Sequence, residues 1–222
     1  MKIFISYSRR DDAPVRSLVA DLQRARQQVW LDEDLGGGEA WWTQILEQIR
    51  DCTVFVLALS SNSLSSKPCR AELDYAKALG VPILPVQVGA VVSYRDDPIF
   101  AMQLVDYRDP TRDSAMALIS ALHDRAAGRG ELPDPLPEPP PIPYAYLQRL
   151  GAAIRGDAAL SPQTQMGMVF ELREALREED DDTVRDDIRN LLRALRARTE
   201  VTLAIATEID TVLAPAGGSP AS

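Results

Sequence analysis

The sequence predicts an α/β protein in which a five-stranded parallel sheet is covered by helices and is followed by a small all-helical module. Short apolar runs alternate with helical patterns about five times within residues 1–126. The run at 53–59 is continuously apolar, as is typical of a strand buried on both faces. After a proline-rich stretch, only helical periodicity remains. These observations divide the chain into a domain at 1–127, a linker at 128–143, a helical module at 144–214 and a flexible tail at 215–222.

Strands are expected where β-branched, aromatic and other apolar residues cluster between polar ones. The expected strands lie at 2–6, 28–32, 53–59, 82–88 and 103–107. Helices are expected where apolar residues recur at intervals of three and four. These segments are 12–22, 41–50, 68–79 and 111–126. Asp12 can cap the first of them, and Pro68 suits the first turn of the third, where its missing N–H costs little.

Alternating strands and helices of this kind build a doubly wound sheet, whose common five-stranded order is 2-1-3-4-5. In that order, the chain reverses its winding direction between the first and third strands. Ligands of such sheets bind at the carboxyl ends of the strands beside that point. We therefore expect a crevice between the loop after Ser6 and the loop after Ser60.

The second half of the chain begins with prolines crowded into 133–143, which predict a stiff, extended spacer; a ligand for a proline-reading module is the alternative. Farther on, apolar residues from Val184 to Val212 follow a 3-4 repeat with weak steps at Arg198 and Thr202. A helix bundle within one chain and a bundle formed between chains both explain this stripe.

The amino-acid composition argues against several classes of function. The chain has 222 residues, is 45% hydrophobic and carries a formal net charge of -9. This acidic balance argues against nucleic acid as a main partner, because phosphate binding needs clustered cations. Two cysteines and no long apolar run are consistent with a cytoplasmic protein without a membrane span. A single histidine excludes a multi-histidine metal site, and we expect no metal.

Several blocks carry a family resemblance. In chain order they read KIFISYSRRDD at 2–12, VWLD at 29–32, GGGE at 36–39, VFVLALS at 54–60 and SKPCRAEL at 66–73. In this order and spacing they resemble the Toll/interleukin-1 receptor (TIR) domain of the bacterial NAD-cleaving type, over about residues 1–126. The resemblance implies a flavodoxin-like sheet. It also implies that the loop at 33–39, made mobile by three glycines, contacts other TIR domains.

Glu72 is the candidate catalytic residue. It lies about one turn into the helix that follows the third strand, beside the expected crevice. It also matches the glutamate that resembling NAD-cleaving TIR domains use in a Ser-x-Trp-Cys-x-x-Glu block. Cleavage of the bond between nicotinamide and ribose builds positive charge on the sugar, which a carboxylate can stabilise. In this chain Pro68 stands at the tryptophan position, which leaves the substrate fit and any cyclised product open.

The candidate substrate-binding residues surround the same crevice. They are Ser6, Tyr7, Arg9, Trp42, Ser60 and Cys69. Arg9 can clamp a pyrophosphate, or pair with a neighbouring aspartate at the surface. Trp42 can offer an aromatic face, or pack in the core. Cys69 stands near a helix start, which lowers a thiol pKa, although a buried structural thiol is the alternative.

Together, the residues and the resemblance predict a NAD+ glycohydrolase that uses NAD+ as a substrate and needs no cofactor. The resemblance implies activation by self-association, as in immune or antiviral defence signalling. The partners expected are NAD+ and TIR domains of the same or another protein, in a homo-oligomer. The alternative is a non-enzymatic adaptor that acts through TIR–TIR contacts, and Pro68 favours it.

Overall fold

The computed structural model describes residues 1–31, 39–92, 98–179 and 181–214. The chain forms two compact units, Met1–Pro143 and Tyr144–Ser222. The sheet of the first unit contains β1 (Lys2–Ser6), β2 (Gln28–Leu31), β3 (Val54–Leu59), β4 (Ile83–Gln87) and β5 (Val105–Asp106). The strands are all parallel in the order β2-β1-β3-β4-β5, which confirms the predicted topology.

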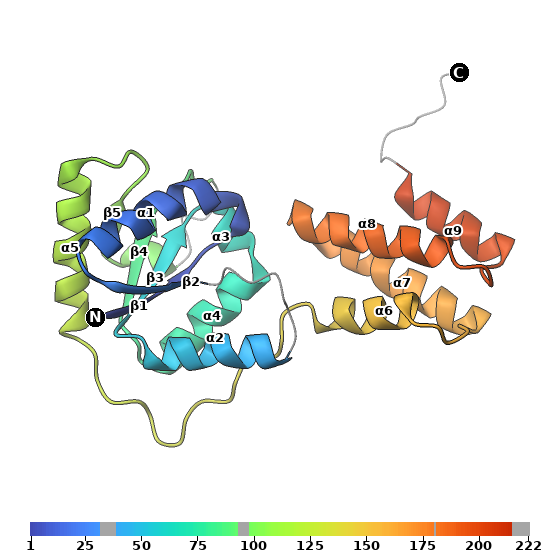
Figure 1. The fold of residues 1–222 in the computed structure, drawn as a ribbon, viewed down its shortest axis with the longest axis horizontal. Helices are drawn as coiled ribbons and strands as arrows, with labels where there is room; N and C mark the ends of the chain where they lie inside the picture. Colours follow the sequence, from blue (N-terminus) through green and yellow to red (C-terminus); the bar gives the residue numbers. More distant parts are fainter. Residues whose placement is uncertain (32–38, 93–97, 180, 215–222) are drawn as a thin grey trace. The chain divides into compact units, whose positions relative to one another are not determined.

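Helices cover both faces of the sheet (Figure 1). They are α1 (Asp12–Arg24), α2 (Glu39–Asp51), α3 (Ser61–Ser65), α4 (Lys67–Ala78) and α5 (Arg112–Ala126), with short 3-10 turns at η1 (Arg9–Asp11) and η2 (Pro98–Ala101). One apolar core joins α1 and α5 to the sheet, and a second joins α2, α3 and α4 to the opposite face. All six residues of β3 are buried, as its continuous apolar run predicts.

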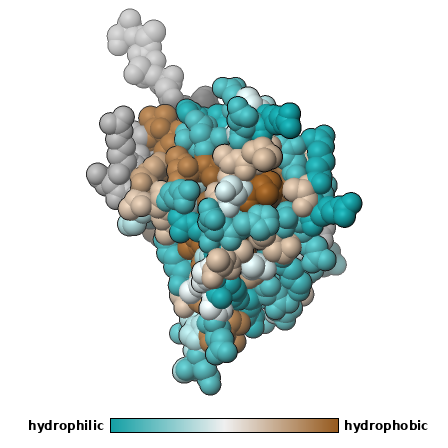
Figure 2. Space-filling view, turned by 90° about the vertical axis from the view of Figure 1, so that its left-hand side faces the viewer, coloured by the Kyte–Doolittle hydropathy of each residue, from teal (hydrophilic) through white to brown (hydrophobic). Residues whose placement is uncertain are grey.

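The side of the first unit that carries α5 has a mixed surface, mostly hydrophilic with scattered hydrophobic residues (Figure 2). In the described part of the chain, no helix has the length and apolar character that crossing a membrane requires.

The proline-rich stretch at 128–143 packs on the first unit, whereas the sequence predicts a spacer. The indole N–H of Trp42 donates to Pro140 O at 2.9 Å. Arg129 Nη2 donates to Arg50 O at 2.8 Å, so both hydrogen bonds connect this stretch to α2. Leu132 and Ile142 pack against the core beneath that helix. We call residues 128–143 the strap. Its attachment depends on partners roughly a hundred residues away, which local composition does not reveal.

The second unit consists of α6 (Ala145–Arg155), α7 (Pro162–Glu178), α8 (Asp182–Arg196) and α9 (Leu203–Leu213). Its apolar residues bury one another within a single chain. That core comprises Leu150, Ile154, Met168, Val169, Leu172, Ile188, Leu191, Leu192, Leu195, Ile205 and Ile209. The apolar residues of the 3-4 stripe therefore pack in a helix bundle within one chain, the first of the two explanations given for this stripe. The tail predicted at 215–222 lies outside the described residues.

Arg198 and Thr202, the two polar positions in the apolar stripe, lie in the turn between α8 and α9. Arg198 donates to the carbonyl oxygens of Ile154, Gly156 and Ala158, each at 2.7 Å, and pairs with Glu200 at 2.6 Å. Thr202 caps α9. A polar residue in a helical repeat can thus mark a turn, because its side chain satisfies carbonyl groups left open by another helix end.

Candidate functional site

The candidate site lies at the carboxyl ends of β1 and β3. Ser6 ends β1 and lies opposite Leu57 of β3 in the parallel register. Leu57 belongs to the core that β3 shares with α4, so Ser6 lies on the α4 face of the sheet. Both Ser6 and Ser60, which directly follows β3, are 1% exposed. The ends of β1 and β3 are therefore neighbours at this edge of the sheet, and both serines are buried there.

Helix α4 brings Cys69 and Glu72 to this edge. Ser66 caps the helix by accepting from Cys69 N at 3.4 Å, and Pro68 occupies its first turn. Cys69 and Glu72 are three residues apart, so they share one face of α4. Cys69 is 3% exposed and Glu72 is 6% exposed. Glu72 is thus buried at this edge, whereas the sequence analysis predicts that it faces a crevice.

The electrostatics of Cys69 show which groups surround it. Burial raises the pKa of the Cys69 thiol to about 12, and the negative charges of Glu72 and Asp11 act in the same direction. Hydrogen bonding to Ser66 and Ser6 opposes this rise in pKa. The Ser6 hydroxyl oxygen makes no hydrogen bond of normal geometry to any described residue, so its contact with the thiol is weak. Cys69 is consequently a protonated, buried thiol, and the lowered pKa considered from its helix position is not found.

Asp11 is the residue of this site that the sequence analysis overlooked. It ends η1 and is 6% exposed. Its carboxylate accepts hydrogen bonds from Ser60 Oγ at 2.5 Å and from Asn62 Nδ2 at 2.8 Å. The loop after β1 is thereby joined to the loop after β3. In the sequence Asp11 stands in a run of four charged residues, where a surface position is the ordinary expectation, and no local signal separates it from Asp12.

Ser60 is the second half of this connection. Its hydroxyl also accepts from Ser63 N at 3.1 Å, in a capping box at the start of α3. Gly89, just after β4, approaches the same point: a Cβ there would lie 3.0 Å from Ser60 Cβ. Glycine at this position therefore allows the loop after β4 to pass closer to Ser60 than a side chain would without a shift of its neighbour. We call Ser6, Asp11, Ser60, Cys69 and Glu72 the rim cluster.

Three predicted site residues lie outside the rim cluster. Tyr7 is half-buried against the core on the α1 side, which is the opposite face of the sheet from Ser6. Arg9 is exposed in η1, two residues before Asp11. Trp42 is 3% exposed in the core, and its N–H bonds to the strap, so its ring serves packing rather than a binding surface.

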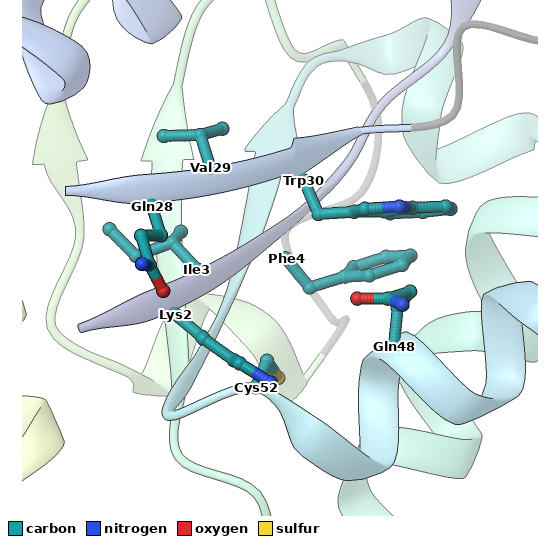
Figure 3. Close-up of a pocket in the computed structure, with 8 residues that line it drawn as sticks. All are labelled: Lys2, Ile3, Phe4, Gln28, Val29, Trp30, Gln48 and Cys52. Atoms are coloured by element: carbon teal, nitrogen blue, oxygen red, sulfur yellow. The ribbon is translucent and has the colours of Figure 1, made fainter.

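Two cavities of the described residues lie elsewhere. One of about 180 Å³ lies near the start of β1 and β2, lined by residues that include Phe4, Trp30 and Gln48 (Figure 3). The other, of about 560 Å³, lies between α1 and α5. The loop predicted at 33–39 to contact other TIR domains falls, except for Glu39, outside the described residues. Within the described ranges, no three acidic, histidine or cysteine side chains gather as a metal site.

Two comparisons with known proteins bear on the family of this chain. No curated protein matches it significantly. The family model for the TIR domain matches residues 3–121, more than half of the chain. That range contains four strands in full, β1 from Ile3 onward, and every residue of the rim cluster. The chain therefore belongs to the TIR domain family.

Proposed function

We propose that this protein is a TIR-type NAD+ glycohydrolase, with Glu72 as its catalytic carboxylate. TIR domains act in signalling, and some of them cleave NAD+. The observation that carries the proposal is the burial of Glu72 in the rim cluster, at the edge where doubly wound sheets bind ligands. A carboxylate removed from solvent acts on a developing charge more strongly than an exposed one, because water screens it less.

The reaction consumes NAD+ and water and yields nicotinamide, ADP-ribose and a proton. The bond that breaks joins the nicotinamide nitrogen to the ribose, and its electron pair leaves with the neutral nicotinamide. Glu72 would stabilise the positive charge that develops on the ribose and hold the sugar hydroxyl groups. Because the leaving group is neutral, no strong general acid is required. The exposed Arg9 is the candidate partner for the pyrophosphate, from the same loop as Asp11.

The test is the release of free nicotinamide when concentrated protein is incubated with NAD+. Glu72→Gln keeps the size of the side chain and removes its charge, and we expect a loss of roughly 10²–10³-fold in rate. Asp74→Asn is the matched control, because Asp74 is an exposed acid on the same helix and pairs only with Lys77 among the described residues. A Glu72→Gln variant that retained the wild-type rate would remove Glu72 from the chemistry.

The second candidate function is a non-enzymatic adaptor that works through TIR–TIR contacts. One observation favours it: Pro68 occupies the expected tryptophan position. Proline offers no broad ring face for a base or a nicotinamide. If wild-type protein releases no nicotinamide even when crowded or crosslinked, the adaptor function is the correct one.

We further propose that the protein works in the cytoplasm as a homo-oligomer, in immune or antiviral defence signalling, and that the helical unit brings TIR domains together. Removal of residues 144–222 should then lower the number of chains per oligomer, obtained from light scattering as the oligomer mass divided by the mass of one chain, and with it any nicotinamide release. An unchanged number of chains would show that the helical unit has no part in assembly.

A further inference from the structure

The outer side of β2 carries backbone groups that no described strand pairs. β2 is the edge strand of the sheet, next to β1. Gln28 N donates to Met1 O at 3.0 Å, on the β1 side. Because successive residues of a strand point their N–H and C=O groups to opposite sides, the groups of Val29 and Leu31 point away from β1. The open edge therefore presents two donors and two acceptors.

Among the residues that the structure describes, this edge carries none of the usual protection against pairing. Natural edge strands carry charged side chains, a proline or a bulge that blocks a second strand. The residues of β2 are Gln, Val, Trp and Leu, with neither charge nor proline. Two residues before the strand lies Arg26, and directly after it comes Asp32. An antiparallel pair of identical strands would set the basic end of one against the acidic end of the other, which favours pairing although the chain as a whole is acidic.

Trp30 gives the edge an aromatic centre. Its ring stacks on Phe4 with centroids 5.0 Å apart, and Phe4 stacks on Phe55 at 5.4 Å. Figure 3 shows Trp30 and Phe4 on one face of the strands and Val29 on the other. Trp30 ends this row and is half-buried, beside the cavity of about 180 Å³. A second aromatic ring placed next to it would remove further apolar surface from water.

We propose that β2 pairs antiparallel with β2 of a second copy of this chain, about a two-fold axis at Trp30. Val29 of each strand then exchanges both backbone hydrogen bonds with Leu31 of the other. The two Trp30 residues face each other as a pair without backbone hydrogen bonds, the closer of the two antiparallel pairings. Such a contact is isologous, so it closes as a dimer with a continuous ten-stranded sheet. This inference is independent of NAD+ cleavage.

Sedimentation velocity of the full chain over a wide concentration range tests the proposal. Val29→Pro removes an outward N–H without removing a bond to β1, as proline does at edge positions. We expect it to raise the dimer dissociation constant by at least about ten-fold. Val29→Ala is the matched control, because it trims the side chain and keeps the N–H. A wild-type chain that stays monomeric, or a Val29→Pro variant that dimerises as the wild type does, would overturn the proposal.

Disulfide crosslinking tests the register separately from the affinity. Trp30→Cys, made together with Cys52→Ala so that no second thiol lines the cavity, should form a covalent dimer under mild oxidation, because facing residues of this kind lie within disulfide reach. Adding Val29→Pro to that chain should abolish the dimer. Gln23→Cys, on the exposed surface of α1, is the control that should not crosslink. Equal crosslinking at positions 23 and 30 would contradict the register.

Discussion

The two units of this chain use buried polar groups in opposite ways. In the first unit, Ser6, Ser8, Asp11, Ser60, Ser63, Ser66 and Glu72 are buried, and they gather at the carboxyl ends of the strands. In the described part of the helical unit, only Gln165 and Glu179 belong to this group, and polar bonds join helix ends at the connections before α7, between α7 and α8, and after α8. Burying polar groups costs free energy unless they are bonded. The first unit concentrates that cost at one edge, as binding sites do, whereas the helical unit uses its polar bonds to join helix ends.

The largest expected effect is on the helical unit. Arg198→Ala leaves three carbonyl groups and Glu200 without their partner, and we expect it to lower the free energy of unfolding of this unit by about 2–3 kcal/mol. All three tryptophans, Trp30, Trp41 and Trp42, lie in the first unit. Urea unfolding followed by both far-ultraviolet circular dichroism and tryptophan fluorescence therefore separates the units.

Arg193→Ala is the control for this experiment, because Arg193 lies on α8 just before the turn that holds Arg198, and its described side-chain bond is an exposed one to Asn190. The expected change there is within about 0.5 kcal/mol. If tryptophan fluorescence shifted together with circular dichroism in Arg198→Ala, the two units would not unfold independently.

The corresponding change in the first unit is Asp11→Ala. It removes the acceptor for Ser60 and Asn62 in a buried place, so we expect a loss of about 1–3 kcal/mol, seen by tryptophan fluorescence. Asp12→Ala is the matched control, since Asp12 is partly exposed and bonds to Arg16 on the surface of α1. Equal stability of the two variants would mean that the bonds of Asp11 do not hold the strand-end loops together.

A smaller effect is expected where the strap meets α2. Trp42→Phe keeps an aromatic ring in the core and removes the N–H that bonds to Pro140, a loss of about 1 kcal/mol. Amide hydrogen exchange should then rise in the non-proline residues of 128–143. Trp30→Phe, which leaves the strap bond intact, should not raise it, and exchange unchanged in both variants would show that the bond does not hold the strap.

The smallest effect concerns pH. The bond from Tyr107, followed by the bond and charge of Arg24, lowers the pKa of Asp21 below its ordinary 3.8. A lowered folded-state pKa contributes stability that is complete above the unfolded value and is lost as the pH falls through the folded one. Tyr107→Phe should therefore weaken the first unit at neutral pH and reduce its loss of stability below about pH 4. Thermal melts at several pH values measure this, and parallel pH curves would contradict it.

The sheet was predictable because each strand carries its own signal. The run of β3 is apolar throughout since both its faces are buried. The strand order is the common one for a five-stranded doubly wound sheet, and the resemblance to TIR domains implies it as well. The serines at the strand ends and Glu72 were predictable for the same reason, because parallel strands place their carboxyl ends on one edge. The five residues of α3 were missed, since a helix this short has no apolar periodicity and begins on the capping box of Ser60.

The sequence by itself determined the class of the fold and which strand ends come to one edge of the sheet, because these depend on local periodicity and on chain direction. Only the tertiary structure decided that Asp11 joins two loops, that Trp42 holds the strap, and that Arg198 joins the turn after α8 to the end of α6. Each of these depends on a partner distant in the chain. Hydrogen-bond partners are chosen by proximity in the folded chain, and a polar side chain in a sequence does not indicate which distant group will lie within reach.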